Sequence, residues 1–302
     1  MSDVLICEVG PRDGLQNAKH LMPTEAKKRW IGALAAAGLR EIEVGSFVPP
    51  KLIPAMADTG EIVAHARTLR GVKVVALAPI VKGFERALAA GAHKVTFPVS
   101  ASRRHSEANV RMTPEQMVAE VGKCAALRSA GDPQIEGAVS TAFGCTLQGE
   151  VPEDEVVRLA VALAGFCDAV ALADTVGYAN PAQVRRLFRR VRSEIGDKLE
   201  GAHFHDTRGL GLANALAAWE EGVRAFDASM GGLGGCPFAP GASGNVITED
   251  LVFMFEAMGV RTGIDLQKLF AARAVLIEGL PDEPLYGHTA LAGLPKGFRA
   301  AA

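Results

Sequence analysis

Short apolar runs alternate with longer segments of helical periodicity along the whole chain. The runs hold few polar residues, which is typical of parallel strands that are buried on both faces. They predict strands at residues 5–9, 41–45, 72–78, 94–99, 135–141, 169–173, 201–205 and 225–229. The intervening segments predict helices at 24–37, 62–69, 83–90, 114–129, 153–165, 181–194, 210–221 and 248–258, with an extra helix at 266–278.

Residues at the predicted helix ends support these boundaries. Thr24 and Thr113 stand where a hydroxyl can accept a hydrogen bond from the first helical turn, so we expect both to be N-caps. Gly38, Gly91 and Gly222 follow predicted helices, where the left-handed backbone of a helix end favours glycine. The alternation is therefore one of separate strand–helix units.

Eight strand–helix units in about 260 residues fit a closed (β/α)₈ TIM barrel better than a doubly wound open sheet. The 302 residues contain no Pro/Ser-rich linker, so we expect a single catalytic domain over residues 1–302. Its barrel would span about 5–260, followed by a C-terminal helix and tail at 261–302. We expect the tail from Pro281 to pack across one end of the barrel or at a subunit interface.

The composition excludes several classes of protein. The 32 basic and 34 acidic residues balance, which speaks against nucleic-acid binding and against a polybasic membrane anchor. No apolar stretch approaches the length of a membrane span, and the N-terminus lacks the pattern of a signal segment. The five cysteines are an odd number without CxxC pairs, so we expect reduced thiols in a cytoplasmic protein.

Polar residues cluster at the predicted strand ends, where a barrel enzyme carries its chemistry. Arg12 and Asp13 follow the first strand, and Glu43 lies late in the second. The other candidates are Asp174 after the sixth strand, His203 and His205 on the seventh, and Cys236 and Asn245 in the loop after the eighth.

His203 and His205 are the strongest indication of a metal site. They are two residues apart in a strand, so their side chains project to the same side. The alternative is a pair of hydrogen-bonded barrel histidines. Together with Asp13 and the amide oxygen of Asn245 they form a nitrogen and oxygen ligand set that favours Mg²⁺ or Mn²⁺. Zn²⁺ stays open, because two histidines and a carboxylate also form catalytic zinc sites.

Cys236 lies among glycines, in a loop that could fold over a ligand. A catalytic or ligand-contacting thiol competes here with a packing residue and with a loop that cradles a phosphate. Cys7, Cys124 and Cys167 lie in or beside predicted strands and helices and fit structural thiols. Glu43 and Asp174 could instead be ion-pair partners of Arg12 inside the barrel.

Five segments resemble the hydroxymethylglutaryl-CoA lyase family, and the similarity runs from about residue 5 to residue 280 of the printed sequence. The HxHDT segment and the RDG turn are shared with a wider superfamily of metal-dependent barrel lyases and synthases, whereas the cysteine loop is more specific to the lyases. The segments are VGPRDGLQN (9–17), EVGSFVPPK (43–51), ADTVG (173–177), HFHDT (203–207) and GGLGGCPFAPGASGN (231–245).

The resemblance implies a carbon–carbon lyase that acts on an acyl-CoA. Its divalent cation would bind the hydroxyl and the carboxylate of the acyl group. Arg12 would stabilise the enolate of acetyl-CoA, and Cys236 would protonate it. Glu43 and Asp174 would orient Arg12 or relay the proton. A homodimer is also implied. The cation would be held by Asp13, His203, His205 and Asn245.

The chain departs from the family at the acyl pocket, where Ala138 and Ala171 stand in place of a tyrosine and a serine of the animal enzymes. A related substrate such as citramalyl-CoA therefore stays open beside hydroxymethylglutaryl-CoA. An acetyl-CoA-condensing synthase is a further possibility, but such enzymes usually have another C-terminal domain and give Cys236 no clear role. A barrel that binds acyl-CoA without catalysis is the non-enzymatic alternative.

Overall fold

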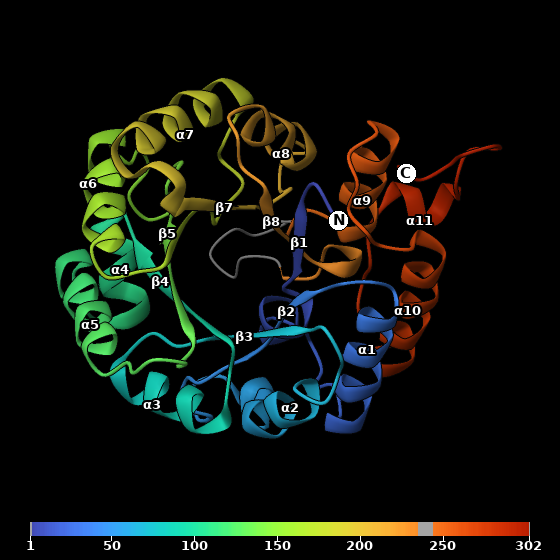
Figure 1. The fold of residues 1–302 in the computed structure, drawn as a ribbon, viewed down its shortest axis with the longest axis horizontal. Coiled ribbons are helices and arrows are strands. Elements are labelled where there is room, and N and C mark those ends of the chain that lie inside the picture. The colour runs from blue at the N-terminus through green and yellow to red at the C-terminus, as the bar shows by residue number, and fades with distance from the viewer. Residues whose placement is uncertain (1, 235–243, 302) are drawn as a thin grey trace.

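The eight predicted strands form a closed parallel barrel in which each strand pairs with the next and β8 pairs with β1 (Figure 1). The structure is a computed structural model and describes residues 2–234 and 244–301. The expected (β/α)₈ barrel is thus confirmed. Its strands are β1 (Leu5–Glu8), β2 (Glu41–Ser46), β3 (Lys73–Leu77), β4 (Lys94–Ser100), β5 (Gln134–Ser140), β6 (Ala169–Asp174), β7 (Leu199–Phe204) and β8 (Ala225–Ala228).

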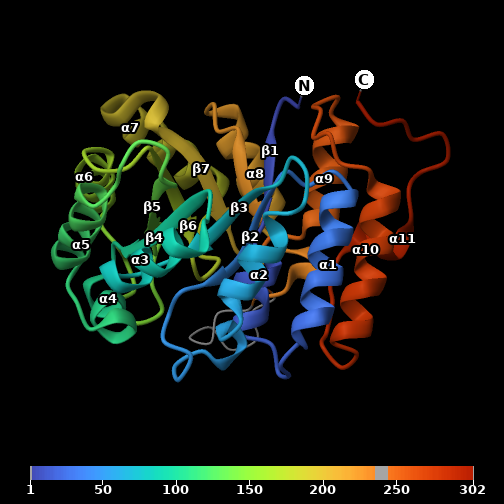
Figure 2. The same ribbon diagram turned by 60° about the horizontal axis from the view of Figure 1, so that its bottom comes forward.

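The helices surround the barrel, and α10 packs against α1 beside it, which confirms the extra C-terminal helix (Figure 2). Short helical turns follow β1 (η1, Gly10–Gly14) and β8 (η4, Met230–Gly232). The α-helices are α1 (Thr24–Ala36), α2 (Thr59–Ala66), α3 (Val81–Ala90), α4 (Arg103–Val110), α5 (Pro114–Ala126), α6 (Glu153–Ala164), α7 (Pro181–Ile195), α8 (Gly211–Glu220), α9 (Thr248–Ala257), α10 (Leu266–Gly279) and α11 (His288–Ala292).

Two of the expected helix ends have different outcomes. Thr113 caps α5 and forms a reciprocal capping box with Gln116, as expected. The expected cap at Thr24 is wrong, because Pro23 occupies the N-cap position and the Thr24 hydroxyl donates to Asp58 Oδ2 at 2.8 Å. The sequence pattern also missed α4, a short polar helix whose sequence carries no apolar periodicity.

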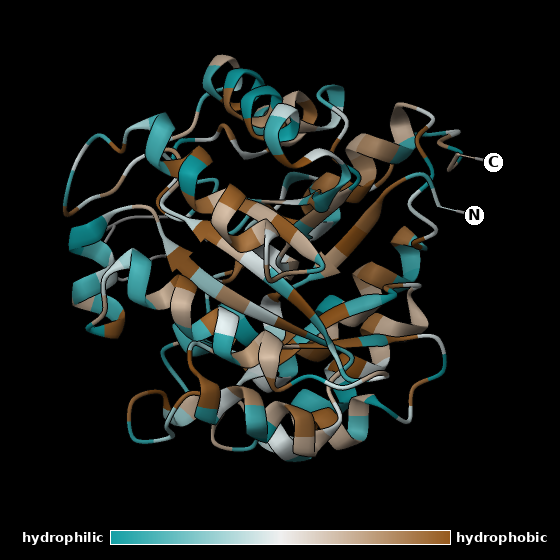
Figure 3. Cartoon of the chain, turned by 60° about the vertical axis from the view of Figure 1, so that its left-hand side comes forward, coloured by the Kyte–Doolittle hydropathy of each residue, from teal (hydrophilic) through white to brown (hydrophobic). Residues whose placement is uncertain are grey.

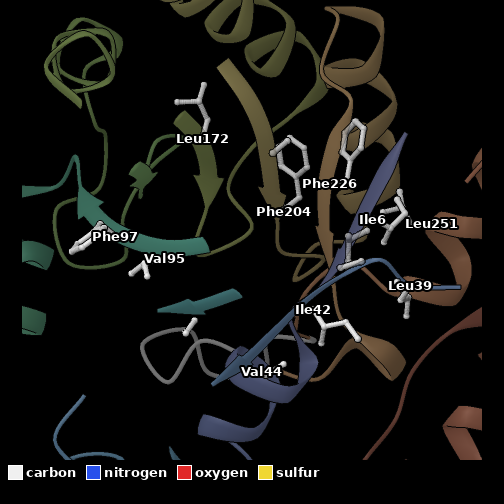
Figure 4. Close-up of a cluster of buried hydrophobic side chains, with 14 of the residues drawn as sticks. Ile6, Leu39, Ile42, Val44, Val95, Phe97, Leu172, Phe204, Phe226 and Leu251 are labelled. Atoms are coloured by element: carbon white, nitrogen blue, oxygen red, sulfur yellow. The ribbon is translucent and has the colours of Figure 1, made fainter. Parts of the chain in front are cut away.

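The core lies between the strands and the helices. Alternate strand residues point outward into this layer. There the ring of Phe226 on β8 packs against that of Phe255 on α9, with centroids 5.2 Å apart and an interplanar angle of 46°. Figure 4 shows further members of the layer, such as Ile42 and Phe204. The strands are mostly apolar, while many helices combine hydrophilic and hydrophobic residues (Figure 3). This two-sided burial explains why the strands were readable as apolar runs.

Charged residues occupy the barrel interior near the amino ends of the strands. Lys94 of β4 donates to Glu41 of β2 and, at 3.0 Å, to Glu136 Oε2 of β5. All three side chains are buried, and their pairing offsets the cost of placing charges there. The carboxyl ends of the strands, at the opposite end, hold the candidate site.

The C-terminal tail packs against the loop after β8 and against α9. The backbone N–H of Tyr286 donates to the Gly231 carbonyl at 2.8 Å, and Asp250 accepts from the N–H groups of His288 and Thr289. Within the described residues, no helix is long and apolar enough to cross a membrane. The cysteines of this part of the chain are buried and unpaired: Cys7, Cys124, Cys145 and Cys167.

Candidate metal centre

A buried glutamate on β1 joins the two loops that carry the site. The Oε1 atom of Glu8 accepts hydrogen bonds from the N–H of Gly10 at 3.0 Å and of Met230 at 2.8 Å, and Thr248 donates to Oε2. Burial raises the pKa of Glu8 to about 8, against the opposing effect of these hydrogen bonds. Because Gly10 opens η1 and Met230 opens η4, Glu8 fixes the two loops relative to each other.

Three predicted metal ligands meet at the carboxyl end of the barrel. One ligand atom from each of Asp13, His203 and His205 lies within 4.8 Å of the others. The Nε2 atom of His205 is 3.8 Å from Asp13 Oδ2, and the two imidazole rings are 5.1 Å apart between centroids. Asn245 joins them, because its Nδ2 donates to Asp13 Oδ2 at 2.7 Å and to the Leu233 carbonyl at 2.9 Å.

These residues fit a divalent cation. The Oδ1 atom of Asn245 is buried and has no hydrogen-bond partner among the described residues, so it is available as a ligand. Burial, with the charges of His203 and Arg12, lowers the pKa of His205 to about 3, which keeps its imidazole neutral as metal binding requires. Burial acts to raise the pKa of Asp13, but the nearby charges of Arg12 and the two histidines have the larger effect, so the pKa is lowered. The available ligands are therefore one carboxylate, one amide oxygen and two imidazoles, which suit a divalent cation.

Arg12 is held beside this cluster by two carboxylates. Its Nε donates to Glu43 Oε2 and its Nη1 to Asp13 Oδ1, each at 2.6 Å. Burial raises the pKa of Glu43 to about 7, although the charge of Arg12 opposes this. The second oxygen of Glu43 is buried and finds no partner in the described parts of the chain. A guanidinium fixed in this way can face an anionic substrate atom, and Glu43 can exchange a proton near neutral pH.

Asp174 has a different set of partners from this cluster. Asp174 ends β6 fully buried, and its carboxylate accepts the N–H groups of Tyr178 at 2.9 Å and Ala179 at 3.0 Å. These bonds hold the loop before α7, and burial raises the pKa of Asp174. Cys236 lies in 235–243, outside the described residues. The catalytic roles expected of Asp174 and Cys236 stay predictions.

The sequence pattern missed two neighbours of the ligands. Gln16 donates to Asp13 Oδ1 at 3.1 Å, and Asp227 of β8 lies with its Oδ2 3.0 Å from Nδ1 of His203. Burial acts to lower the pKa of His203, but the hydrogen bond to Asp227 and its charge outweigh burial and raise it. For Asp227 the available signal was that it is the one charged residue of the predicted strand at 225–229.

The chain matches the HMGL-like family model over residues 3–276. It is 40% identical to the hydroxymethylglutaryl-CoA lyase YngG of Bacillus subtilis over 93% of this chain and 94% of that protein. It is also 40% identical to the mitochondrial hydroxymethylglutaryl-CoA lyase of Rattus norvegicus, over 92% and 86%. An HMG-CoA lyase from Acinetobacter baumannii, solved with coenzyme A and 3-methylmalate, superposes with a TM-score of 0.92 at 42% identity and covers 98% and 97% of the two chains. This chain therefore belongs to the HMGL-like family.

Proposed function

We propose that this chain is a lyase that cleaves 3-hydroxy-3-methylglutaryl-CoA to acetyl-CoA and acetoacetate with a divalent cation. One observation carries the proposal: the Arg12–Glu43 pair adjoins a ligand set at the carboxyl end of the barrel, in a chain whose relatives are named as this lyase. The ligand set is Asp13, His203, His205 and Asn245.

The reaction defines what the site must do. The 3-hydroxyl loses its proton, the bond between C2 and C3 breaks, and C3 becomes the ketone of acetoacetate. The electron pair of that bond passes to the other fragment as the enolate of acetyl-CoA, whose carbon then takes a proton. Bound Mg²⁺ or Mn²⁺ would supply a Lewis acid and a template for substrate oxygens. The side chains must remove one proton, stabilise one negative oxygen and return one proton.

The described geometry supports a role for each of two residues. Arg12 is fixed by Glu43 and Asp13, so it can present N–H groups to the thioester oxygen that becomes the enolate oxygen. Glu43 combines a pKa of about 7 with an unpartnered oxygen, and both properties suit a proton relay. For Cys236 the support is the family resemblance: a thiol with a reference pKa of ~8.5 is protonated at neutral pH and can return the proton. Asp174 would support the site by holding its loop.

A second candidate substrate is a related 3-hydroxy acyl-CoA with a different branch. Ala138 and Ala171 are register partners on β5 and β6. Two methyl side chains, in place of the tyrosine and serine of the animal enzymes, would give a roomier acyl pocket. The Acinetobacter baumannii relative was solved with coenzyme A and 3-methylmalate, a branched hydroxydicarboxylate. This favours branched dicarboxylic acyl groups as substrates.

The test is a panel of 3-hydroxy acyl-CoAs incubated with the protein and Mg²⁺ or Mn²⁺. We expect equal amounts of acetyl-CoA and acetoacetate from hydroxymethylglutaryl-CoA, loss of the activity with EDTA, and recovery when either metal is returned. Cleavage of citramalyl-CoA alone would move the assignment to the second substrate. Binding of acyl-CoA without products from any member would favour the non-catalytic barrel, and condensation of acetyl-CoA with a keto acid would favour the synthase.

The proposal also includes a cellular compartment and an oligomeric state. The buried, unpaired cysteines of the described residues support a reducing compartment such as the cytoplasm. The family resemblance implies a homodimer, and the molar mass from light scattering of the purified protein tests this.

A further inference from the structure

We propose that Asp227 is a positioning residue that orients His203 for metal binding. The inference rests on the proposed function, because it takes His203 as a ligand of the divalent cation. Asp227 would accept a hydrogen bond from Nδ1–H of His203 and so leave the lone pair of Nε2 for the cation.

The two residues lie side by side on adjacent strands of the barrel. His203 of β7 and Asp227 of β8 are register partners in the parallel pairing, and His203 Nδ1 lies 3.0 Å from Asp227 Oδ2. A neutral imidazole carries one N–H, so a carboxylate at Nδ1 selects the tautomer with an unprotonated Nε2. Both side chains start from paired strands of the closed barrel, so their backbone positions are fixed relative to each other.

The second histidine shows why His203 needs this support. The His205 side chain is 5% exposed and that of His203 is 12% exposed, so packing restrains His205 more tightly. The Nδ1 atom of His205 has no hydrogen-bond partner within residues 2–234 and 244–301. Orientation of His205 therefore comes from packing and that of His203 from a hydrogen bond.

Asp227 has two competing roles, that of a direct metal ligand and that of a general negative charge inside the barrel. The role of ligand conflicts with the geometry, since the carboxylate lies at Nδ1, while a ring has its two nitrogens on different edges. The role of general charge is tested with Glu136. That acid also faces the barrel interior, but it pairs with Lys94 and Thr96 and contacts none of the described ligands. Glu136→Gln therefore removes an equal charge without the hydrogen bond.

The first measurement is Mn²⁺ affinity, by electron paramagnetic resonance titration of the metal-free protein. Loss of a partner that orients a ligating histidine typically weakens metal binding by about 10- to 100-fold. We expect a loss of this size in Asp227→Asn, whose amide can also turn its N–H toward Nδ1 and favour the other tautomer. Asp227→Glu should keep part of the affinity, and Glu136→Gln should bind like the wild type. Circular dichroism checks that each variant is folded.

The second measurement needs no variant of Asp227. In ¹⁵N spectra of the metal-free wild type, recorded at a pH high enough for His203 to be neutral, His203 should appear as the Nδ1–H tautomer, with its signals assigned by their loss in His203→Gln. The Nε2–H tautomer would refute the proposal directly. Equal Mn²⁺ affinities of Asp227→Asn and wild type would also refute it, as would an equal loss in Glu136→Gln. A wild type that binds no Mn²⁺ would instead overturn the proposed metal site itself.

Discussion

Gly234 is the point at which one added methyl group should disable the metal site. This glycine has φ +99°, and a Cβ there would lie 2.6 Å from Asn245 Nδ2 and 3.1 Å from Asp13 Oδ2. Ordinary contacts begin at 3.4 Å, so in Gly234→Ala the amide of Asn245 would have to move by about 0.8 Å. The displaced group is a proposed ligand.

The size of the effect follows from two separate contributions. A left-handed backbone costs a residue with a Cβ roughly 1–2 kcal/mol, whatever its surroundings. Loss of the groups that orient metal ligands typically weakens metal binding by about 10- to 100-fold, and a displaced ligand should cost a similar factor. Gly131→Ala is the matched control, because Gly131 has φ +92° and nothing within 4 Å of its Cβ position.

Urea denaturation and Mn²⁺ titration measure the two contributions independently. Both variants should lose about 1–2 kcal/mol of unfolding free energy from the strained backbone, but only Gly234→Ala should lose about 10- to 100-fold in Mn²⁺ affinity. Wild-type Mn²⁺ binding by Gly234→Ala would refute the reasoning, and so would an equal loss of affinity in Gly131→Ala.

Three further predictions address other parts of the site. Arg12→Lys cannot reproduce the bonds to Glu43 and Asp13, so steady-state kinetics should show turnover lower by roughly 1,000-fold with a nearly unchanged KM; a rise in KM alone would make Arg12 a binding residue. Cys236→Ser should cleave slowly while it binds Mn²⁺ and acyl-CoA normally, and near-normal turnover would exclude the thiol as proton donor. The folded-state pKa of Glu8, about 8, exceeds its unfolded value of 4.5, so the native protein retains a proton that the unfolded chain releases, and stability falls as pH rises through this range. In urea denaturation at pH 5 and pH 8, Glu8→Gln should therefore gain stability relative to wild type at the higher pH, and a constant difference would contradict the assignment.

The barrel could be predicted from the sequence because most strand residues are buried, so apolar runs such as 169–173 stand out against the helices. The ligands could be predicted because parallel strands end at the same side of the barrel. The partner of His203 could not, since Asp227 becomes its neighbour only through the register of β7 with β8. The helix Arg103–Val110 escaped because its residues are mostly polar.

Asp13 links the two halves of the proposed chemistry through its two oxygens. Its Oδ1 accepts from Arg12 and Gln16, while its Oδ2 accepts from Asn245 and faces Nε2 of His205. The carboxylate is charged because its pKa is lowered, so it offsets the charge of Arg12 while it also serves the ligand set. A cation bound there would share the negative charge of Asp13, so less of that charge would neutralise the guanidinium of Arg12. Arg12 would then face the developing enolate with more of its charge available, at the moment when that charge lowers the barrier.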